Sequence, residues 1–145
     1  MQEFEIINKY FSSLSKLNKY ALKLNDDVFY DKKNHLVISV DTYNEGNHFL
    51  NFKNPELVIK KIIRSSISDL ICKGVYPKFY FISGSGNKIK FSKNNLLKIS
   101  KSLSQEQKKY KIFLSGGDTT FSNKLSFSIT SVGYTKKIVY RNNAK

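Results

Sequence analysis

The sequence predicts an α+β fold, a mixed sheet with helices packed on one face. Stretches with helical apolar spacing alternate with short apolar stretches typical of strands, and no repeat or low-complexity linker interrupts that order. The chain has 145 residues, the size of one domain, and hydrophobic residues make up 40% of it, which is enough to fill a core. We therefore treat the chain as one folding unit.

Helices are expected in three places. Apolar residues at helical spacing predict the first over residues 3–17. Asn54 followed by Pro55 provides an N-cap and a first-turn proline for the second helix, which Gly74 can end. The third is expected over residues 94–109.

Strands are expected over residues 27–30, 35–42, 78–83, 111–114 and 125–133. The continuous apolar character of residues 35–42 is typical of a strand buried on both faces. From Leu125 to Thr130, apolar residues alternate with hydroxyl residues, which gives the last strand two different faces. We expect the last two strands to be antiparallel neighbours.

The chain is strongly basic, with a formal net charge of +14. Such a charge suits a nucleic acid, a membrane surface or an anionic small substrate. The lysine pairs at 60–61, 108–109 and 136–137 lie in different predicted elements, and no aromatic ribonucleoprotein motif accompanies them. The first residues lack the basic start and apolar stretch of a targeting segment. We therefore treat most lysines as solvated surface residues and expect a cytoplasmic protein with neither a nucleic-acid nor a membrane partner.

Acidic residues are sparse, yet five of the eleven fall in four short motifs. These are Asn25-Asp26-Asp27, Ser39-Val40-Asp41-Thr42, Ser68-Asp69-Leu70 and Gly116-Gly117-Asp118-Thr119-Thr120. Three of the four follow or lie within apolar stretches such as residues 36–38 and 112–114. An aspartate at the end of a buried strand is costly to desolvate unless a cation meets it, and Mg²⁺ bridging to phosphates is a common partner. The pattern predicts a metal-and-phosphate site.

The four motifs, in this order and at this spacing, resemble those of thiamine-monophosphate kinases. The stretch Glu45-Gly46-Asn47-His48-Phe49 distinguishes this family from relatives such as selenophosphate synthetase. The resemblance covers the family's N-terminal ATP-binding domain, which is similar to that of aminoimidazole ribonucleotide synthetase. It implies transfer of the γ-phosphate of ATP to thiamine monophosphate, giving thiamine diphosphate, with several Mg²⁺ ions.

The resemblance also assigns roles to the residues that match. The magnesium ligands would be Asp27, Ser39, Asp41, Asp69 and Asp118, with Val40 contributing its backbone carbonyl. ATP would be contacted by Gly117, Asp118 and Arg141, and thiamine monophosphate by His48. The residue types suit these roles, because carboxylate and hydroxyl oxygens are hard donors for Mg²⁺ and an arginine can hold a phosphate through two hydrogen bonds.

Ordinary structural explanations remain open for single motifs. Asp26 and Asp27 could form a simple turn, and His48 could be a surface or core histidine. Val40 stands where a threonine is usual in the family, which removes a hydroxyl near the predicted metals. The alternative to a kinase is therefore a catalytically incomplete module of the same superfamily that binds magnesium and nucleotide or serves dimerisation.

Residues 1–145 match only the family's N-terminal domain, and the second domain, which closes the active site in the family, is expected to be absent. We expect binding of nucleotide and magnesium to survive this absence better than catalysis. The resemblance further implies a homodimer that pairs its sheets. A monomer with a covered sheet would satisfy the same strand pattern.

Overall fold

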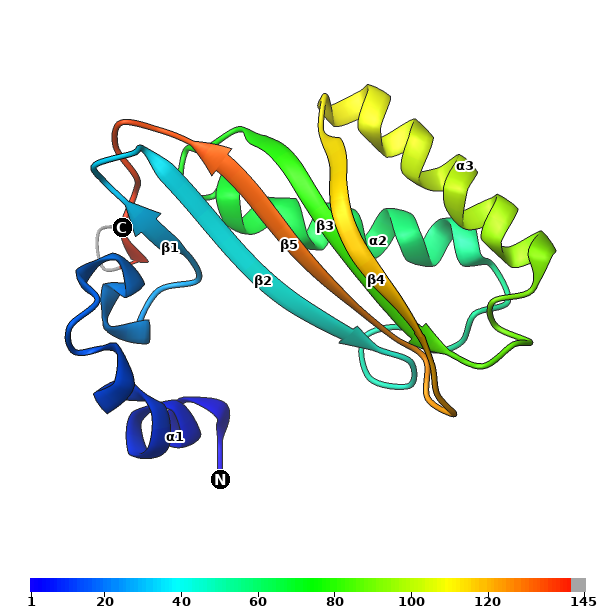
Figure 1. The fold of residues 1–145 in the computed structure, drawn as a ribbon, viewed down its shortest axis with the longest axis horizontal. Helices are drawn as coiled ribbons and strands as arrows, with labels where there is room; N and C mark the ends of the chain where they lie inside the picture. The colour runs from blue at the N-terminus through cyan, green and yellow to red at the C-terminus, as the bar shows by residue number, and fades with distance from the viewer. Residues whose placement is uncertain (142–145) are drawn as a thin grey trace.

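The computed structural model of the chain describes residues 1–141 and has the α+β fold that the sequence predicts (Figure 1). Its strands are β1 (Phe29–Asp31), β2 (Leu36–Asn44), β3 (Pro77–Gly86), β4 (Phe113–Phe121) and β5 (Ser126–Tyr134). Within the described residues they form one five-stranded sheet in the order β1-β2-β5-β3-β4. Only β3 and β4 pair in parallel, so the sheet is mixed, as expected.

The two long helices, α2 (Pro55–Ile71) and α3 (Lys93–Tyr110), lie on the same face of the sheet (Figure 1). Asn54 and Pro55 occupy the predicted N-cap and first-turn positions of α2. Gly74 has a φ angle of +76°, a conformation that glycine adopts without strain, and it ends the helical path as predicted. Across residues 1–141, every helix is too short or too polar to cross a lipid bilayer.

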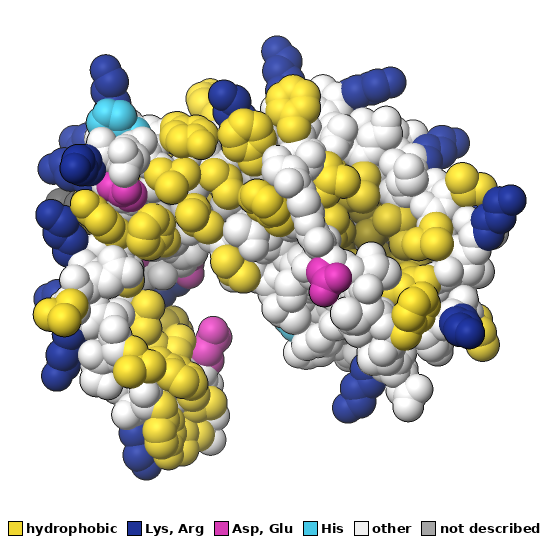
Figure 2. Space-filling model, in the orientation of Figure 1, with side chains coloured by type: hydrophobic (Ala, Val, Ile, Leu, Met, Phe, Trp, Pro, Cys, Tyr) yellow, Lys and Arg dark blue, Asp and Glu magenta, His cyan; other side chains and the backbone are white. Residues whose placement is uncertain are grey.

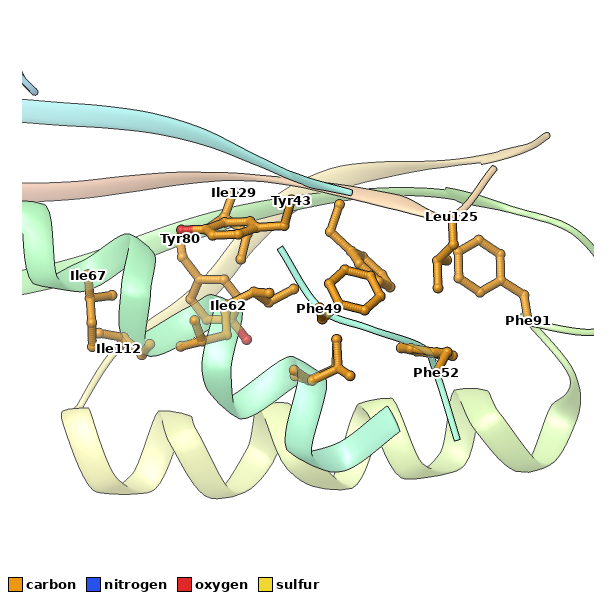
Figure 3. Close-up of a cluster of buried hydrophobic side chains, with 14 residues drawn as sticks. Tyr43, Phe49, Phe52, Ile62, Ile67, Tyr80, Phe91, Ile112, Leu125 and Ile129 are labelled. Atoms are coloured by element: carbon orange, nitrogen blue, oxygen red, sulfur yellow. The ribbon is translucent and has the colours of Figure 1, made fainter. Parts of the chain in front are cut away.

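The main core lies between α2 and the sheet (Figure 3). Four isoleucines of α2 are buried there: Ile59, Ile62, Ile63 and Ile67. A cluster of four phenylalanines fills the end of the core near the start of α2. The ring centroid of Phe127 in β5 lies 5.9–6.4 Å from those of Phe49, Phe52 and Phe91. This packing fixes α2 against the sheet and so fixes the position of Asp69.

The helix α3 is held mainly by α2. Glu106 is buried and accepts two hydrogen bonds from Arg64, at 2.8 and 2.9 Å. The hydroxyl of Ser102 donates to the backbone carbonyl of Glu56 at 2.8 Å. These contacts bind α3 to the outer side of α2.

The prediction that residues 35–42 are buried on both faces is wrong. Val37, Ser39 and Tyr43 are buried under the helices, whereas Val40 is 65% exposed on the other side of β2. The reason is that both long helices cover the same face, so the opposite face of the sheet stays open (Figures 1 and 2). We call this second side the open face; on β2 it carries Val40 and Thr42.

The predicted pairing of the last two strands is also wrong. Strand β4 pairs in parallel with β3, and β5 lies between β2 and β3. The connection from β3 to β4 contains α3, and a crossover of that length is what parallel neighbours require. Because β4 follows β3 along its length, it extends to Phe121 instead of ending at Leu114, and the glycine pair before Asp118 is part of a strand.

The first predicted helix is not continuous. Only α1 (Glu3–Ile6) is α-helical, and it is followed by a π-helical turn, η1 (Ile7–Phe11), and by 3-10 turns, η2 (Ser12–Ser15) and η3 (Lys19–Leu24). Apolar side chains that should have formed a buried stripe, among them Phe4, Phe11 and Leu14, are exposed. Short helices are marginal without packing, and no element of the described residues covers this stripe.

Candidate functional site

Three of the predicted metal-binding aspartates line one cavity of about 290 Å³. Asp27 comes from the segment before β1, Asp41 from β2, and Asp69 from the last turns of α2. Val40 and Arg141 line the same cavity. The fold thus brings together residues that are up to 114 positions apart in the sequence.

The side chains of Asp41 and Asp69 interact, and burial is the largest influence on the pKa of each. Burial, together with the charge of Asp41 and a hydrogen bond to it, raises the pKa of Asp69 to about 7. Burial also raises the pKa of Asp41, with a further contribution from the charge of Asp27, while the hydrogen bond with Asp69 opposes this rise. Two facing carboxylates cannot both be charged at low cost, so the pair holds a shared proton or needs a cation.

Two buried oxygen atoms on β2, one of them in Asp41 itself, have no hydrogen-bond partner within residues 1–141. The hydroxyl of Ser39 and Oδ2 of Asp41 are buried and have no hydrogen-bond partner among the described residues. Leaving such atoms without a partner is costly. Both are hard oxygen donors, so the residues fit a Mg²⁺ ion.

The protein alone does not form a closed metal site in the part of the chain that the structure describes. No group of three or more His, Cys, Asp or Glu residues there is arranged to hold a metal ion. Mg²⁺ keeps several waters and is commonly bound by one or two carboxylates together with substrate phosphates. The arrangement therefore suits an ion whose remaining ligands come from water and phosphate.

Arg141 lies at the edge of the cavity and contacts Asp27. Its guanidinium donates to Oδ1 of Asp27, and its backbone N–H donates to Oδ2 of Asp26 at 3.1 Å. The sequence predicted a phosphate contact for Arg141 but not this pairing. Nothing in the sequence pointed to the partner of Asp26, the buried side chain of Lys73.

His48 lies in the loop between β2 and α2 and is not among the residues that line the aspartate cavity. Its Nδ1 accepts a hydrogen bond from the backbone N–H of Asn44 at 2.9 Å, which leaves Nε2 to interact with a ligand. The ring packs edge-on against Tyr43, with centroids 5.7 Å apart. Burial raises the pKa of Tyr43 to about 12, so this phenol keeps its proton beside Asp41 and Asp69.

Gly117 and Asp118 are not brought to the cavity. Asp118 pairs with Ser83 of β3, Ser83 pairs with Ser128 of β5, and Ser128 pairs with Thr42 of β2. Residues that pair across neighbouring strands point to the same side of a sheet. Asp118 therefore lies on the open face, whereas Asp41, next to Thr42, points to the helix-covered face. A Cβ at position 117 would stand 1.8 Å from the carbonyl oxygen of Ile82, so close strand packing explains that glycine.

A second, larger cavity of about 770 Å³ adjoins the first and shares Asp26 and Arg141 with it. Lys16, Lys19 and Lys23 line it, together with uncharged polar residues of the N-terminal segment. Positive side chains thus line the cavity that adjoins the aspartates.

A family comparison agrees with the motifs and the fold. The profile of the family "AIR synthase related protein, N-terminal domain" matches residues 22–135. The chain belongs to this family. That range contains every predicted site residue except Arg141.

Curated relatives within the family are thiamine-monophosphate kinases. The chain is 36% identical over 152 residues to that of Buchnera aphidicola subsp. Schizaphis graminum, an alignment that covers 99% of the chain and 45% of the relative. It is 33% identical over 141 residues to that of Haemophilus influenzae, covering 94% of the chain and 42% of the relative. The chain spans less than half the length of these relatives.

Solved structures give the same result. A thiamine monophosphate kinase from Aquifex aeolicus superposes with a TM-score of 0.72 at 27% identity, covering 96% of the chain and 46% of that structure. AaThiL complexed with AMPPCP and TMP superposes with a TM-score of 0.76 at 28% identity, covering the whole chain and 47% of that structure. The hydrogenase maturation complex HypE-HypF, at 19% identity and a TM-score of 0.69, shares the fold.

Proposed function

We propose that this chain is the ATP- and magnesium-binding N-terminal domain of a thiamine-monophosphate kinase, which transfers the γ-phosphate of ATP to thiamine monophosphate. The observation that carries the proposal is the convergence of Asp27, Asp41 and Asp69 on one cavity beside buried oxygens that lack partners. The sequence relatives and the ligands of AaThiL, AMPPCP and TMP, support the same activity.

The metal would be held by Asp27, Asp41 and Asp69, with Ser39 and the carbonyl of Val40 as further oxygen donors. When bound, Mg²⁺ neutralises charge on the transferred phosphoryl group and orients it. For Asp41 and Asp69, the same ion would relieve their mutual repulsion. Binding would displace the shared proton, so affinity for the ion should rise as pH rises toward 8.

Arg141 would bind a phosphate of ATP. In the structure its guanidinium pairs with Asp27. A cation that binds Asp27 competes with this pair and leaves the guanidinium free to contact phosphate. The lysine-lined cavity on the other side of Arg141 adds positive potential where the triphosphate would approach.

His48 would bind the phosphate of thiamine monophosphate through Nε2. The hydrogen bond to its Nδ1 fixes the ring, and the edge-on contact with Tyr43 limits its rotation. Phosphoryl transfer depends mainly on holding the two phosphates in line. We assign His48 this positioning role and assign no general acid or base.

Gly117 and Asp118 would serve a second copy of the chain. Asp118 lies on the open face, which also exposes Val40, Phe81 and Phe113. We propose a homodimer that pairs these faces and so presents Asp118 to the metal and ATP of its partner. The apolar residues support pairing, because a monomer seldom leaves such a face uncovered.

The domain assignment follows from the length comparison. We propose that residues 1–145 make up one N-terminal domain and that turnover also requires the second domain of the family, which excludes water from the reacting groups. A cytoplasmic location fits a kinase that uses ATP, and we propose neither a nucleic-acid nor a membrane partner.

Calorimetric titration of a non-hydrolysable ATP analogue, with and without Mg²⁺, tests the proposal. The chain should bind the analogue only with Mg²⁺, and Asp69→Asn should abolish that binding. Lys101→Met on the exposed side of α3 is the control and should bind as the unmodified chain does. Absence of binding in every condition would contradict the magnesium-nucleotide site and leave dimerisation as the function of the fold.

A further inference from the structure

A buried ion pair adjoins the aspartate cavity, because Asp26, one of its members, lines that cavity. Lys73 is only 5% exposed, and its Nζ contacts Oδ1 of Asp26, whose side chain is 6% exposed. Replacing such a pair by apolar residues of similar volume is often neutral or even stabilising, because both charges must be desolvated. The pair is therefore weakly explained by stability alone.

Asp26 connects this lysine to the predicted ligands. Its Oδ1 also accepts the backbone N–H of Asp27 at 2.8 Å, and its Oδ2 accepts the backbone N–H of Arg141. Asp27 and Arg141 in turn contact each other through their side chains. One carboxylate thus holds the backbones of both members of the Asp27–Arg141 pair.

Lys73 holds the same segment at a second point. Its backbone carbonyl accepts the N–H of Val139 at 3.1 Å, two residues before Arg141. Lys73 also follows Asp69 by four residues, and its N–H still bonds the carbonyl of Leu70 as the helical path ends. Helix α2 therefore carries Asp69, and the turn that follows it carries the lysine that contacts Asp26 and the segment before Arg141.

We propose that Lys73 is a positioning residue, which holds Asp27 and Arg141 in register with Asp69 through its buried contact with Asp26. This inference rests on the proposed function for the roles of Asp27 and Arg141, but the contacts themselves can be tested without any ligand. Lys73 does not line the aspartate cavity, and we assign it no contact with substrate or metal. Its effect is exerted through Asp26.

The first test is amide hydrogen exchange in the unligated chain, followed by NMR. Lys73→Met removes the charge and keeps most of the volume, and it should speed exchange of the Asp27 and Arg141 amides at least about tenfold relative to the amide of Ile129 in the core. Lys73→Arg keeps the charge and should largely preserve protection. Lys101→Met, at an exposed position, should change neither amide. Unchanged exchange at Asp27 and Arg141 in Lys73→Met would overturn the proposal.

A second variant covers the case in which Lys73→Met does not fold. Lys73→Met combined with Asp26→Asn leaves no buried charge alone, so it should fold and still show fast exchange at Asp27 and Arg141. Normal protection in this double variant would mean that the pair is only structural.

The nucleotide titration then separates this inference from the proposed function. Lys73→Met should weaken magnesium-dependent binding of the ATP analogue at least about tenfold, whereas Lys73→Arg should restore most of it. If the unmodified chain does not bind the analogue, the proposed function fails, and the exchange data still decide whether Lys73 positions Asp27 and Arg141.

Discussion

In the absence of divalent cations, Asp69→Asn should raise the free energy of unfolding at pH 8 and change that free energy little at pH 4. Burial and the neighbouring Asp41 raise the pKa of Asp69 to about 7, from an ordinary value of 3.8. The folded state therefore holds this proton more tightly than the unfolded state does. The resulting stability is fully present below pH 3.8 and is lost as the pH rises through about 7. Asparagine has no such proton to lose.

The size of the effect follows from the shift in pKa. A rise of about 3 units corresponds to about 4 kcal/mol of unfolding free energy if the site were fully shielded from water. Asp69 is only partly buried and lines an open cavity, so solvent screening should reduce the difference to about 2 kcal/mol. With a urea dependence of about 2 kcal/mol per molar, the unfolding midpoint should rise by about 1 M at pH 8.

Urea unfolding at pH 4, 6 and 8 with a chelator present is the assay. Circular dichroism is a suitable signal, because the chain has no tryptophan. Asp118→Asn removes the same charge from the open face and should move the midpoint by less than about 0.3 M. Adding Mg²⁺ at pH 8 should narrow the gap, since the ion stabilises only the unmodified chain. A difference between the urea midpoints of Asp69→Asn and the unmodified chain that is the same at pH 4, 6 and 8 would refute the reasoning.

Substitutions at Gly117 and His48, each with a control variant, should separate packing from binding. Gly117→Ala places a Cβ 1.8 Å from the carbonyl oxygen of Ile82 and should lower the unfolding free energy by more than about 3 kcal/mol. In the control variant Gly46→Ala the new Cβ meets no atom within 4 Å. That variant should lower the unfolding free energy by only about 1 kcal/mol, because position 46 has a φ angle of +86°. Equal urea midpoints for these two variants would contradict the strand contact. His48→Gln should weaken binding of thiamine monophosphate about tenfold in calorimetry and leave binding of the ATP analogue unchanged. The neighbouring control, Asn47→Ala, should bind both ligands as the unmodified chain does. Equal loss of both ligands would instead indicate that His48 only supports the loop.

Much of the fold could be predicted from local sequence. The predictions are correct for the start of α2 at Asn54 and Pro55, for its end at Gly74, and for the alternating burial along β5. Each of these features depends on the conformational preference of a few adjacent residues. The mixed sheet followed from the order of these elements. The same local information failed for residues 3–17, since the apolar spacing is present but no described element covers it.

The motifs also determined which residues are candidates for the site. Asp27, Asp41 and Asp69 were selected from the sequence, and the structure places all three on one cavity. The separation of Asp118 from them could not be predicted, because it depends on which strand β4 pairs with and therefore on which face its side chain takes. A strand's partner is set by contacts between distant residues.

The sequence by itself determined the element types from β1 to β5, the acidic motifs and the family to which they belong, because those depend on residue identity and spacing along the chain. Only the tertiary structure decided the parallel pairing of β4 with β3, the raised pKa of Asp69 beside Asp41, and the burial of Lys73 against Asp26. The physical reason is that burial and mutual distance set the electrostatic energy of a charged group, and both quantities exist only once distant segments have packed together.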